Sequence, residues 1–140
     1  EQTDEAVCVI DLDTVMPGLA LYDFGDLIRG ATSPVAEDET DASKVEMRLP
    51  MFEAIVEGYL ETAANFLTPL EIDLLPFSAK LISLETGIRF LTDHLEGDKY
   101  FRIHRDNHNL DRCRTQLALV KSIEDQEEQM LDFVKKWHRA

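Results

Sequence analysis

Residues 77–95 read FSAKLISLETGIRFLTDHL, and the spacing of their apolar side chains decides the fold class. The apolar positions that recur every three or four residues are Leu81, Leu84, Ile88, Leu91 and Leu95. This spacing places them on one face of an α-helix, because a helix turns once in about 3.6 residues. Gly97 follows, and a glycine just past the last periodic position is typical of a helix end. The run therefore predicts one long amphipathic helix.

The same periodicity continues on both sides of this run. It predicts a short helix at 21–29, another at 49–63, and a long closing helix at 110–137. Ser122 lies inside the last of these and could restart it as a helix cap. Residues 30–43 are polar and acidic, which predicts a solvated loop. The predicted fold class is therefore mainly α.

A helix start is encoded in residues 68–71. Thr68 is a capping residue, Pro69 suits the first helical position, and Glu71 can close a capping box. Pro76 comes soon afterwards and should end that short helix or kink it.

Residues 5–12 favour a β-strand, because they form a short apolar run rich in β-branched side chains. Pro17 and Gly18 then turn the chain into a loop. A lone buried strand leaves backbone groups unpaired, so its partner should lie upstream of Glu1. We therefore interpret the chain as the C-terminal part of a larger protein.

The composition is that of one globular domain and excludes two classes of function. The 140 residues are 44% hydrophobic, and we expect a single domain over 1–140, with a strand and loop at 5–20 and a helical region at 21–140. A formal net charge of −14 argues against nucleic-acid binding, because phosphates repel such a surface. No apolar run approaches the roughly 18 residues that span a bilayer, and no signal-peptide pattern opens the chain. Cys8 and Cys113 lack metal-ligand spacing, and their number alone allows a disulfide. We expect reduced thiols and a cytoplasmic protein instead.

Two carboxylates lie where the expected strand ends. On an extended backbone the side chains of Asp11 and Asp13 share a face. Mg²⁺ prefers carboxylate oxygens and keeps several waters, so one or two carboxylates with substrate phosphates are sufficient. The alternative is that both side chains bind the backbone amides of a turn. Spacing alone leaves both interpretations open.

Four stretches of the sequence resemble a known family. Residues 9–18, VIDLDTVMPG, and 21–29, LYDFGDLIR, resemble the aminoglycoside phosphotransferase and choline kinase-like superfamily. In that family a strand ends in Ile-Asp, and a loop leads to a helix that opens with Tyr-Asp. Within this superfamily, residues 13–19, DTVMPGL, and 22–26, YDFGD, are similar to the N-acetylhexosamine 1-kinase branch, and so are residues 84–93, LETGIRFLTD, and 97–101, GDKYF. The likeness extends from about Val7 to beyond Arg114 and implies the helical C-terminal lobe of a protein-kinase-like fold.

The resemblance implies roles for three acidic residues. Asp11 would bind the Mg²⁺ that bridges ATP phosphates, and Asp13 would be a second acidic group at the metal or the sugar. Asp23 would steady the catalytic loop without touching the metal. The triplet Asp23-Phe24-Gly25 spells the metal-binding motif of protein kinases, but no strand leads into it. Asp11 is therefore the favoured metal position.

The family's catalytic base and second metal ligand come from a His-x-Asp…Asn loop just before the metal strand, and no such loop precedes Asp11 here. Residues 104–107, HRDN, echo it superficially. We interpret them as a polar turn in which Asp106 or Asn107 caps the last helix. No catalytic residue is assigned within this chain, which we expect to be inactive alone.

Arg89 and Tyr100 are the candidate substrate-binding residues. Arg89 lies in an apolar stretch, where a guanidinium needs a planar acceptor. One interpretation is a structural ion pair with Glu85 or Asp93, each one helical turn away. The other is that Arg89 reaches sugar hydroxyls while Tyr100 packs on the sugar or donates to it.

The parent enzyme that the resemblance implies is an ATP- and Mg²⁺-dependent kinase. It would phosphorylate the anomeric hydroxyl of N-acetylglucosamine or N-acetylgalactosamine, with the amino sugar and ATP as its partners. Two alternatives stay open. The first is a kinase for another small alcohol, such as choline, homoserine or an aminoglycoside, and the second is a non-catalytic helical interaction module. An isolated lobe would expose apolar surface, so self-association is expected as well.

Overall fold

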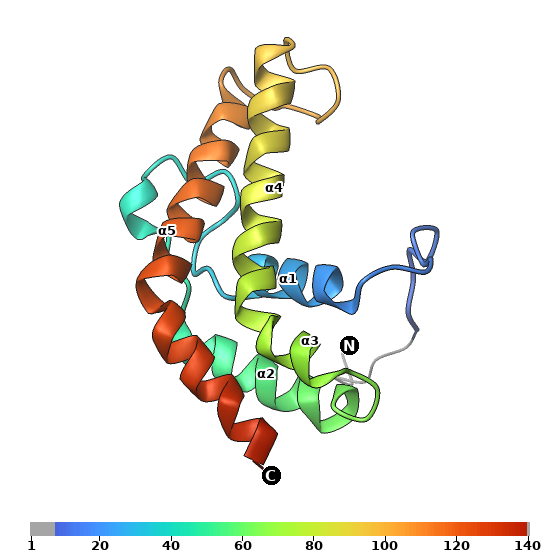
Figure 1. The fold of residues 1–140 in the computed structure, drawn as a ribbon. Helices are drawn as coiled ribbons and strands as arrows, with labels where there is room; N and C mark the ends of the chain where they lie inside the picture. Colours follow the sequence, from blue (N-terminus) through green and yellow to red (C-terminus); the bar gives the residue numbers. More distant parts are fainter. Residues whose placement is uncertain (1–7, 140) are drawn as a thin grey trace, which may run out of the picture.

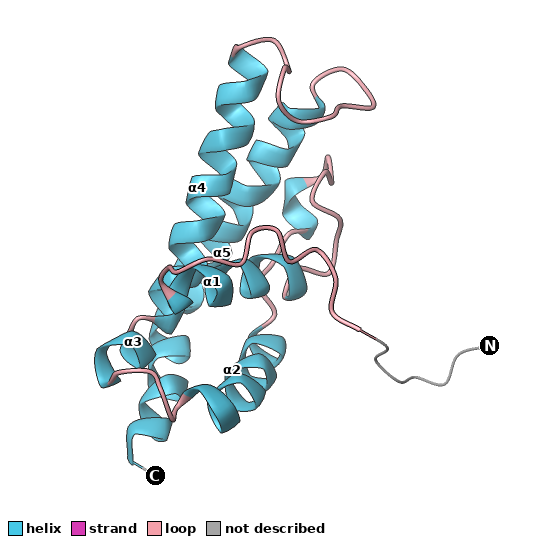
Figure 2. Cartoon of the chain, turned by 90° about the vertical axis from the view of Figure 1, so that its right-hand side faces the viewer, coloured by secondary structure: helices cyan, strands magenta, loops and turns pink. Residues whose placement is uncertain are grey.

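A computed structural model describes residues 8–139, and within this range every regular element is a helix (Figures 1 and 2). In chain order these are α1 (Ala20–Ala31), the 3₁₀ turn η1 (Ala42–Lys44), α2 (Leu49–Ala63), α3 (Pro69–Asp73), α4 (Leu75–Leu95), α5 (His108–Lys135) and the 3₁₀ turn η2 (Lys136–Arg139). The prediction of a mainly helical fold is confirmed. None of the described helices is both long and apolar enough to cross a membrane.

The hydrophobic core lies where α1, α2, the start of α4 and the second half of α5 meet, in the lower half of Figure 1. Its fully buried side chains include Phe24, Ile28, Phe52, Val56, Leu60, Leu119, Ile123, Met130 and Val134. The Phe24 ring contacts Phe52 edge-on at 6.4 Å and Tyr59 at 5.1 Å between centroids, which joins α1 to α2. Each such side chain contributes roughly 1.5–3 kcal/mol by leaving water. This core anchors the lower ends of α4 and α5.

α4 and α5 run antiparallel and continue above the core as a pair (Figure 1). Gly87 lets them approach, since a Cβ at this position would lie 3.1 Å from the Cβ of Gln116. The side chains buried in this upper part are mainly polar, among them Ser83, Asp93, Asn109, Thr115 and Gln116. The upper part is therefore held together by hydrogen bonds more than by apolar packing.

α3 and α4 follow the expected capping chemistry with one difference. The Thr68 side chain accepts from the Glu71 N–H while Glu71 accepts from the Thr68 N–H, so the predicted capping box is confirmed. α3 ends at Asp73, before the proline is reached. Pro76 lies in the first turn of α4, where a missing N–H costs no helical bond. It opens the next helix and does not kink the preceding one.

The predicted N-terminal strand is wrong for the residues that the structure describes. Residues 8–12 form no strand and are exposed, with Val9 at 78% and Ile10 at 77%. Residues 5–7 of that prediction lie outside the described range. An extended segment can form the backbone hydrogen bonds of a β-sheet only with a neighbouring strand, and no strand occurs between residues 8 and 139. The segment therefore extends away from the helices and is exposed to solvent (Figure 1).

α5 is continuous through Ser122, so the predicted restart there is wrong. The Ser122 hydroxyl instead accepts from the Met47 N–H at 2.9 Å. The Gln126 side-chain amide donates to the Met47 carbonyl at 2.7 Å. These two side chains hold the segment before α2 against α5, and the segment's buried Met47 fills the core.

The apolar run that predicted α4 does not face the core. Its five residues Leu81, Leu84, Ile88, Leu91 and Leu95 are between 37% and 76% exposed. The buried face carries small residues instead, including Ala79, Ser83 and Gly87. Small residues let neighbouring helices come close, so α4 packs through its less apolar side. One apolar face of α4 remains open.

α1 crosses α4 at Gly25. A Cβ there would lie 2.5 Å from the Ser78 carbonyl oxygen and 2.6 Å from Cγ1 of Ile82. We expect Gly25→Ala to lower the free energy of unfolding by about 2 kcal/mol, because the helices must separate. Chemical denaturation measures this change. The matched control is Gly30→Ala in the same helix, where a Cβ would meet nothing within 4 Å. It should be neutral or stabilise by up to about 1 kcal/mol, and equal effects of the two substitutions would contradict the close crossing.

Candidate functional site

The site is built at the upper end of α4, where the helix stops in a defined motif. Gly97 adopts φ +91° and its N–H donates to the His94 carbonyl at 3.2 Å. The Asp98 N–H donates to the Asp93 carbonyl at 2.8 Å. These two bonds form a Schellman motif, for which a residue at positive φ is required. The predicted helix end at Gly97 is therefore confirmed, and the chain leaves α4 in a fixed direction.

The Asp93 carboxylate organises the loop that follows. It accepts hydrogen bonds from the N–H groups of Lys99, Tyr100 and Phe101, at 2.9, 2.8 and 2.9 Å. Burial raises the pKa of Asp93, but these N–H donors and the Asn109 amide outweigh it and hold the pKa below its ordinary value. The carboxylate thus fixes three consecutive peptide groups.

Asn109 joins the loop to α5. It is fully buried, and its Nδ2 donates to Asp93 at 2.9 Å and to Asp98 at 2.8 Å. Its Oδ1 accepts from Arg112 at 3.1 Å. Both amide hydrogens and the carbonyl oxygen are therefore satisfied, which is the condition for burying a polar group at little cost.

This loop brings together the two residues that were predicted to contact substrate. The Arg89 guanidinium lies 5.9 Å from the Tyr100 ring centre and 5.5 Å from that of Phe101. A cavity of about 380 Å³ opens beside them, lined by Arg89, Thr92, Asp93, Glu96, Tyr100 and Phe101. Its volume lies within the range of small-molecule sites. Phe101 was not predicted as a lining residue, although the adjacent aromatic residues Tyr100 and Phe101 after Gly97 could have indicated it.

Arg89 has one of the two ion-pair partners that the sequence offered. Its Nε lies 3.7 Å from the Glu85 carboxylate, with both side chains about half exposed. Asp93 is not a partner, because its oxygens are taken by the backbone and by Asn109. An exposed pair of this kind contributes little stability. The guanidinium is therefore left with donors that can face the cavity.

Asp11 and Asp13 lie apart from this cavity in the irregular segment before α1. The expected extended backbone is wrong at this point, since Asp11 has φ 63° and a turn follows it. Both side chains are exposed and make no hydrogen bond or ion pair with residues 8–139. Among these residues no group of three or more His, Cys, Asp or Glu side chains could hold a metal. Two free carboxylates suit Mg²⁺, which takes its remaining ligands from water and phosphate.

Asp23 lies in the first turn of α1 and is exposed. Its neighbours Phe24 and Gly25 are buried in that helix, so the kinase-like triplet is part of the helix packing, as expected. Burial raises the pKa of Tyr59, and the negative charges of Asp23 and Glu71 raise it further. The role of Asp23 as a scaffold for a catalytic loop stays a prediction.

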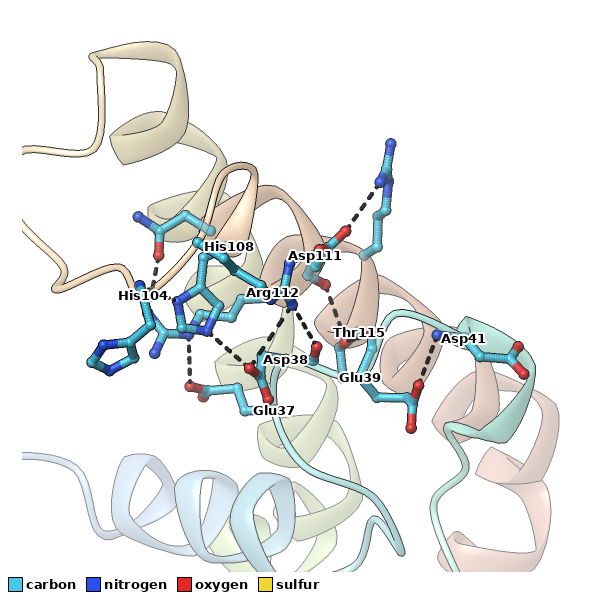
Figure 3. A network of polar contacts seen from close by, with 12 residues as sticks. Glu37, Asp38, Glu39, Asp41, His104, His108, Asp111, Arg112 and Thr115 are labelled. Atoms are coloured by element: carbon cyan, nitrogen blue, oxygen red, sulfur yellow. Dashed lines mark hydrogen bonds and ion pairs between the residues drawn. The ribbon is translucent and has the colours of Figure 1, made fainter.

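The acidic stretch after α1 is not a simple solvated loop. Asp38 is 3.0 Å from Nε2 of His108, and the Thr115 hydroxyl donates to the Glu39 carbonyl at 3.0 Å (Figure 3). Glu37 accepts from Arg29 at 2.6 Å. The expectation missed these contacts because their partners lie on helices: Arg29 on the preceding α1, and His108 and Thr115 on α5, which is far away in sequence.

The turn at residues 104–107 caps α5 in an unexpected way. Asn107 occupies the N-cap position with φ 59° and makes no side-chain capping bond. The His104 N–H donates to Nδ1 of the buried His108 at 3.1 Å. Arg105 forms an ion pair with Asp111, and this contact is the main cause that lowers the pKa of Asp111. The turn is therefore structural.

No protein-family model matches the sequence. The kinase-like resemblance therefore rests on the quoted residues.

Asp93 should make stability depend on pH. Because its pKa is lowered in the folded state, its contribution is fully present above the unfolded pKa of about 3.8 and is lost as pH falls through the folded value. We expect Asp93→Asn to lower the melting temperature at neutral pH by about 5 °C or more. The melting temperature of this variant should also fall less steeply as the pH is lowered. Thermal melts between pH 2 and pH 7 measure both effects.

Asp106→Asn is the control, since it removes the same charge from an exposed side chain with no hydrogen bond or ion pair to the described residues. It should leave the melting profile almost unchanged. Amide exchange at residues 99–101 should accelerate only in the Asp93 variant. Unchanged exchange there would contradict the assigned role of Asp93.

Proposed function

We propose that this chain is the C-terminal part of an ATP-dependent kinase that phosphorylates the anomeric hydroxyl of N-acetylhexosamines. The observation that carries the proposal is the cavity beside Arg89 and Tyr100. These residues were assigned to the sugar from the sequence, and they lie together although a turn and a helix end separate them. The coincidence of sequence resemblance and spatial clustering supports a shared ligand.

The chemistry of the cavity suits a sugar. A pyranose presents hydroxyls at its edge and C–H groups on its faces, so it needs polar donors together with an aromatic surface. Arg89 offers the donors, and Tyr100 offers a ring that is 75% exposed. Phe101 packs against Phe90 at 4.7 Å and supports Tyr100 at 4.8 Å. The platform is thus fixed before ligand arrives, which lowers the entropic cost of binding.

Asp11, with Asp13 beside it, would hold Mg²⁺, and when bound the metal neutralises charge on the ATP phosphates. The free carboxylates of both residues are compatible with this role. The general base would come from a loop outside this sequence, since the segment before Asp11 has no His-x-Asp…Asn pattern. The chain alone is then expected to bind substrate weakly and to lack turnover.

In the full-length enzyme, Asp11→Asn should lower kcat by about 100-fold or more, because the phosphates lose their metal ligand. Steady-state assays with N-acetylglucosamine and ATP measure this. Asp106→Asn is the matched control and should retain normal rates. Near-normal turnover of the Asp11 variant would place the metal elsewhere.

Arg89→Ala and Tyr100→Ala in the full-length enzyme should each raise the KM for the sugar by about tenfold, while the KM for ATP stays constant. Glu85→Ala is the control for Arg89, since it removes the ion pair and leaves the cavity lining intact. The same assay with choline, homoserine and an aminoglycoside distinguishes the alternative kinases. A preference for one of these acceptors would reject the sugar assignment.

The open apolar face of α4 favours a second candidate, a helical interaction module. Its exposed residues include Phe77 at 45% and Ile88 at 55%. We expect this chain to associate with itself as its concentration rises, because burying this apolar face against a second copy removes it from water. Sizing chromatography should show a shift that Ile88→Glu abolishes. Phe66→Glu, in the turn after α2, is the control and should leave the shift unchanged.

If the unmodified chain elutes as a single sharp monomer peak at high concentration, the interaction-module function is rejected. Magnesium titration of the full-length protein with and without ATP separates the two functions. Linked binding of metal and nucleotide supports the kinase, and its absence supports the interaction module.

A further inference from the structure

A second cavity, of about 490 Å³, gathers most of its charge from arginines. It lies between α1, the middle of α4, the loop after α4 and the start of α5. We call it the arginine cleft, and its charged lining consists of Arg29, Arg89, Arg102, Arg112, His104, Asp26 and Glu37. Four guanidiniums thus meet two carboxylates in a chain whose formal net charge is −14. Such a local excess of positive charge needs a physical reason.

The two carboxylates do not neutralise the cleft. Arg29 makes the short contacts with both of them, at 2.7 Å from Asp26 and 2.6 Å from Glu37. Burial lowers the pKa of Arg29, but these two partners outweigh it and raise the pKa above its ordinary value. Arg112 reaches Glu37 only at 3.7 Å. Arg89 pairs with Glu85, also at 3.7 Å, and the Arg102 side chain has no ion pair with the described residues. These three guanidiniums are therefore paired loosely or not at all.

Arg112 is held in place, with one guanidinium donor that makes no hydrogen bond. Its Nη1 donates to the Arg102 carbonyl at 3.3 Å and to Asn109 at 3.1 Å, and its guanidinium lies 5.3 Å from the Phe90 ring centre. Its Nε is buried and makes no hydrogen bond with the described residues, because the Glu37 carboxylate lies 3.7 Å away. A buried donor that makes no hydrogen bond is costly, so an anion that came closer to Nε than Glu37 does would be stabilised there.

Arg102 adds a guanidinium that has no partner among the described residues. Its side chain is exposed and makes no hydrogen bond or ion pair with residues 8–139. The Asp93 network fixes the backbone of the residue before it, so Arg102 leaves the loop at a set position. Arg89 lines the same cleft from α4. Donors from three different elements thus converge on one space.

We propose that the arginine cleft binds the phosphate group of a small phosphorylated metabolite. A phosphate dianion accepts several forked hydrogen bonds at once, which matches guanidinium geometry better than a single carboxylate does. The cleft is large enough to hold more than the phosphate alone. It shares Arg89 and Phe101 with the neighbouring cavity, so a ligand in either cavity would contact these two side chains. The binding itself does not depend on the proposed kinase reaction.

The test is a titration of this chain with inorganic phosphate and with glucose 6-phosphate at constant ionic strength, followed by the arginine Nε–Hε signals in NMR. We expect a saturable shift of the Arg112 signal with both anions, tighter for the sugar phosphate, and none with glucose. Arg102→Gln should weaken binding by about tenfold, because one charge-assisted contact is lost. The substitution keeps the Arg102 carbonyl that positions Arg112.

Arg114→Gln is the control, since Arg114 is on α5 outside the cleft with a side chain 60% exposed. It should leave the affinity unchanged. A missing or unsaturable Arg112 shift would overturn the proposal. Equal weakening by the two substitutions would overturn it as well, because it would indicate general attraction of anions to the surface.

Discussion

The Asp93 carboxylate is the contact on which the upper half of this molecule depends. It sits at the last turns of α4 and accepts three consecutive backbone N–H groups from the loop beyond. Asn109 connects it to α5. A loop with so little apolar burial would otherwise sample many conformations, since ordering each residue costs roughly 1–2 kcal/mol. This one carboxylate therefore determines the positions of Tyr100 and Arg102 in the loop.

The molecule divides its stability between two kinds of contact. Below, α1, α2 and α5 share an apolar core that excludes water. Above, α4 and α5 bury hydrogen-bonded polar side chains, and the candidate ligand cavities open beside this part. Polar contacts to a carboxylate weaken when that carboxylate is protonated, whereas apolar packing does not respond to protonation. The candidate site is thus placed on the part of the fold that is most sensitive to charge.

Local signals predicted most helices well. The capping box at Thr68 and the glycine stop at Gly97 depend on residues within a few positions, and both are confirmed. The strand at residues 8–12 failed because a strand is a property of two segments, and the described chain holds no partner for it. For the same reason the acidic loop at 30–43 was misread as solvated. Its contacts come from arginine, histidine and threonine side chains on other helices.

By itself, the sequence determined the fold class and the helix order, whereas the role of Arg89 and Tyr100 as ligand residues stays a prediction. Periodicity and caps act through neighbouring residues, so they can be read along the chain. Tertiary structure alone decided which face of α4 packs, because close approach at Gly87 outweighed the more apolar opposite side. It also decided that arginines from three helices and a loop meet in one cleft. No local pattern encodes such a meeting, since it arises only when distant segments pack together.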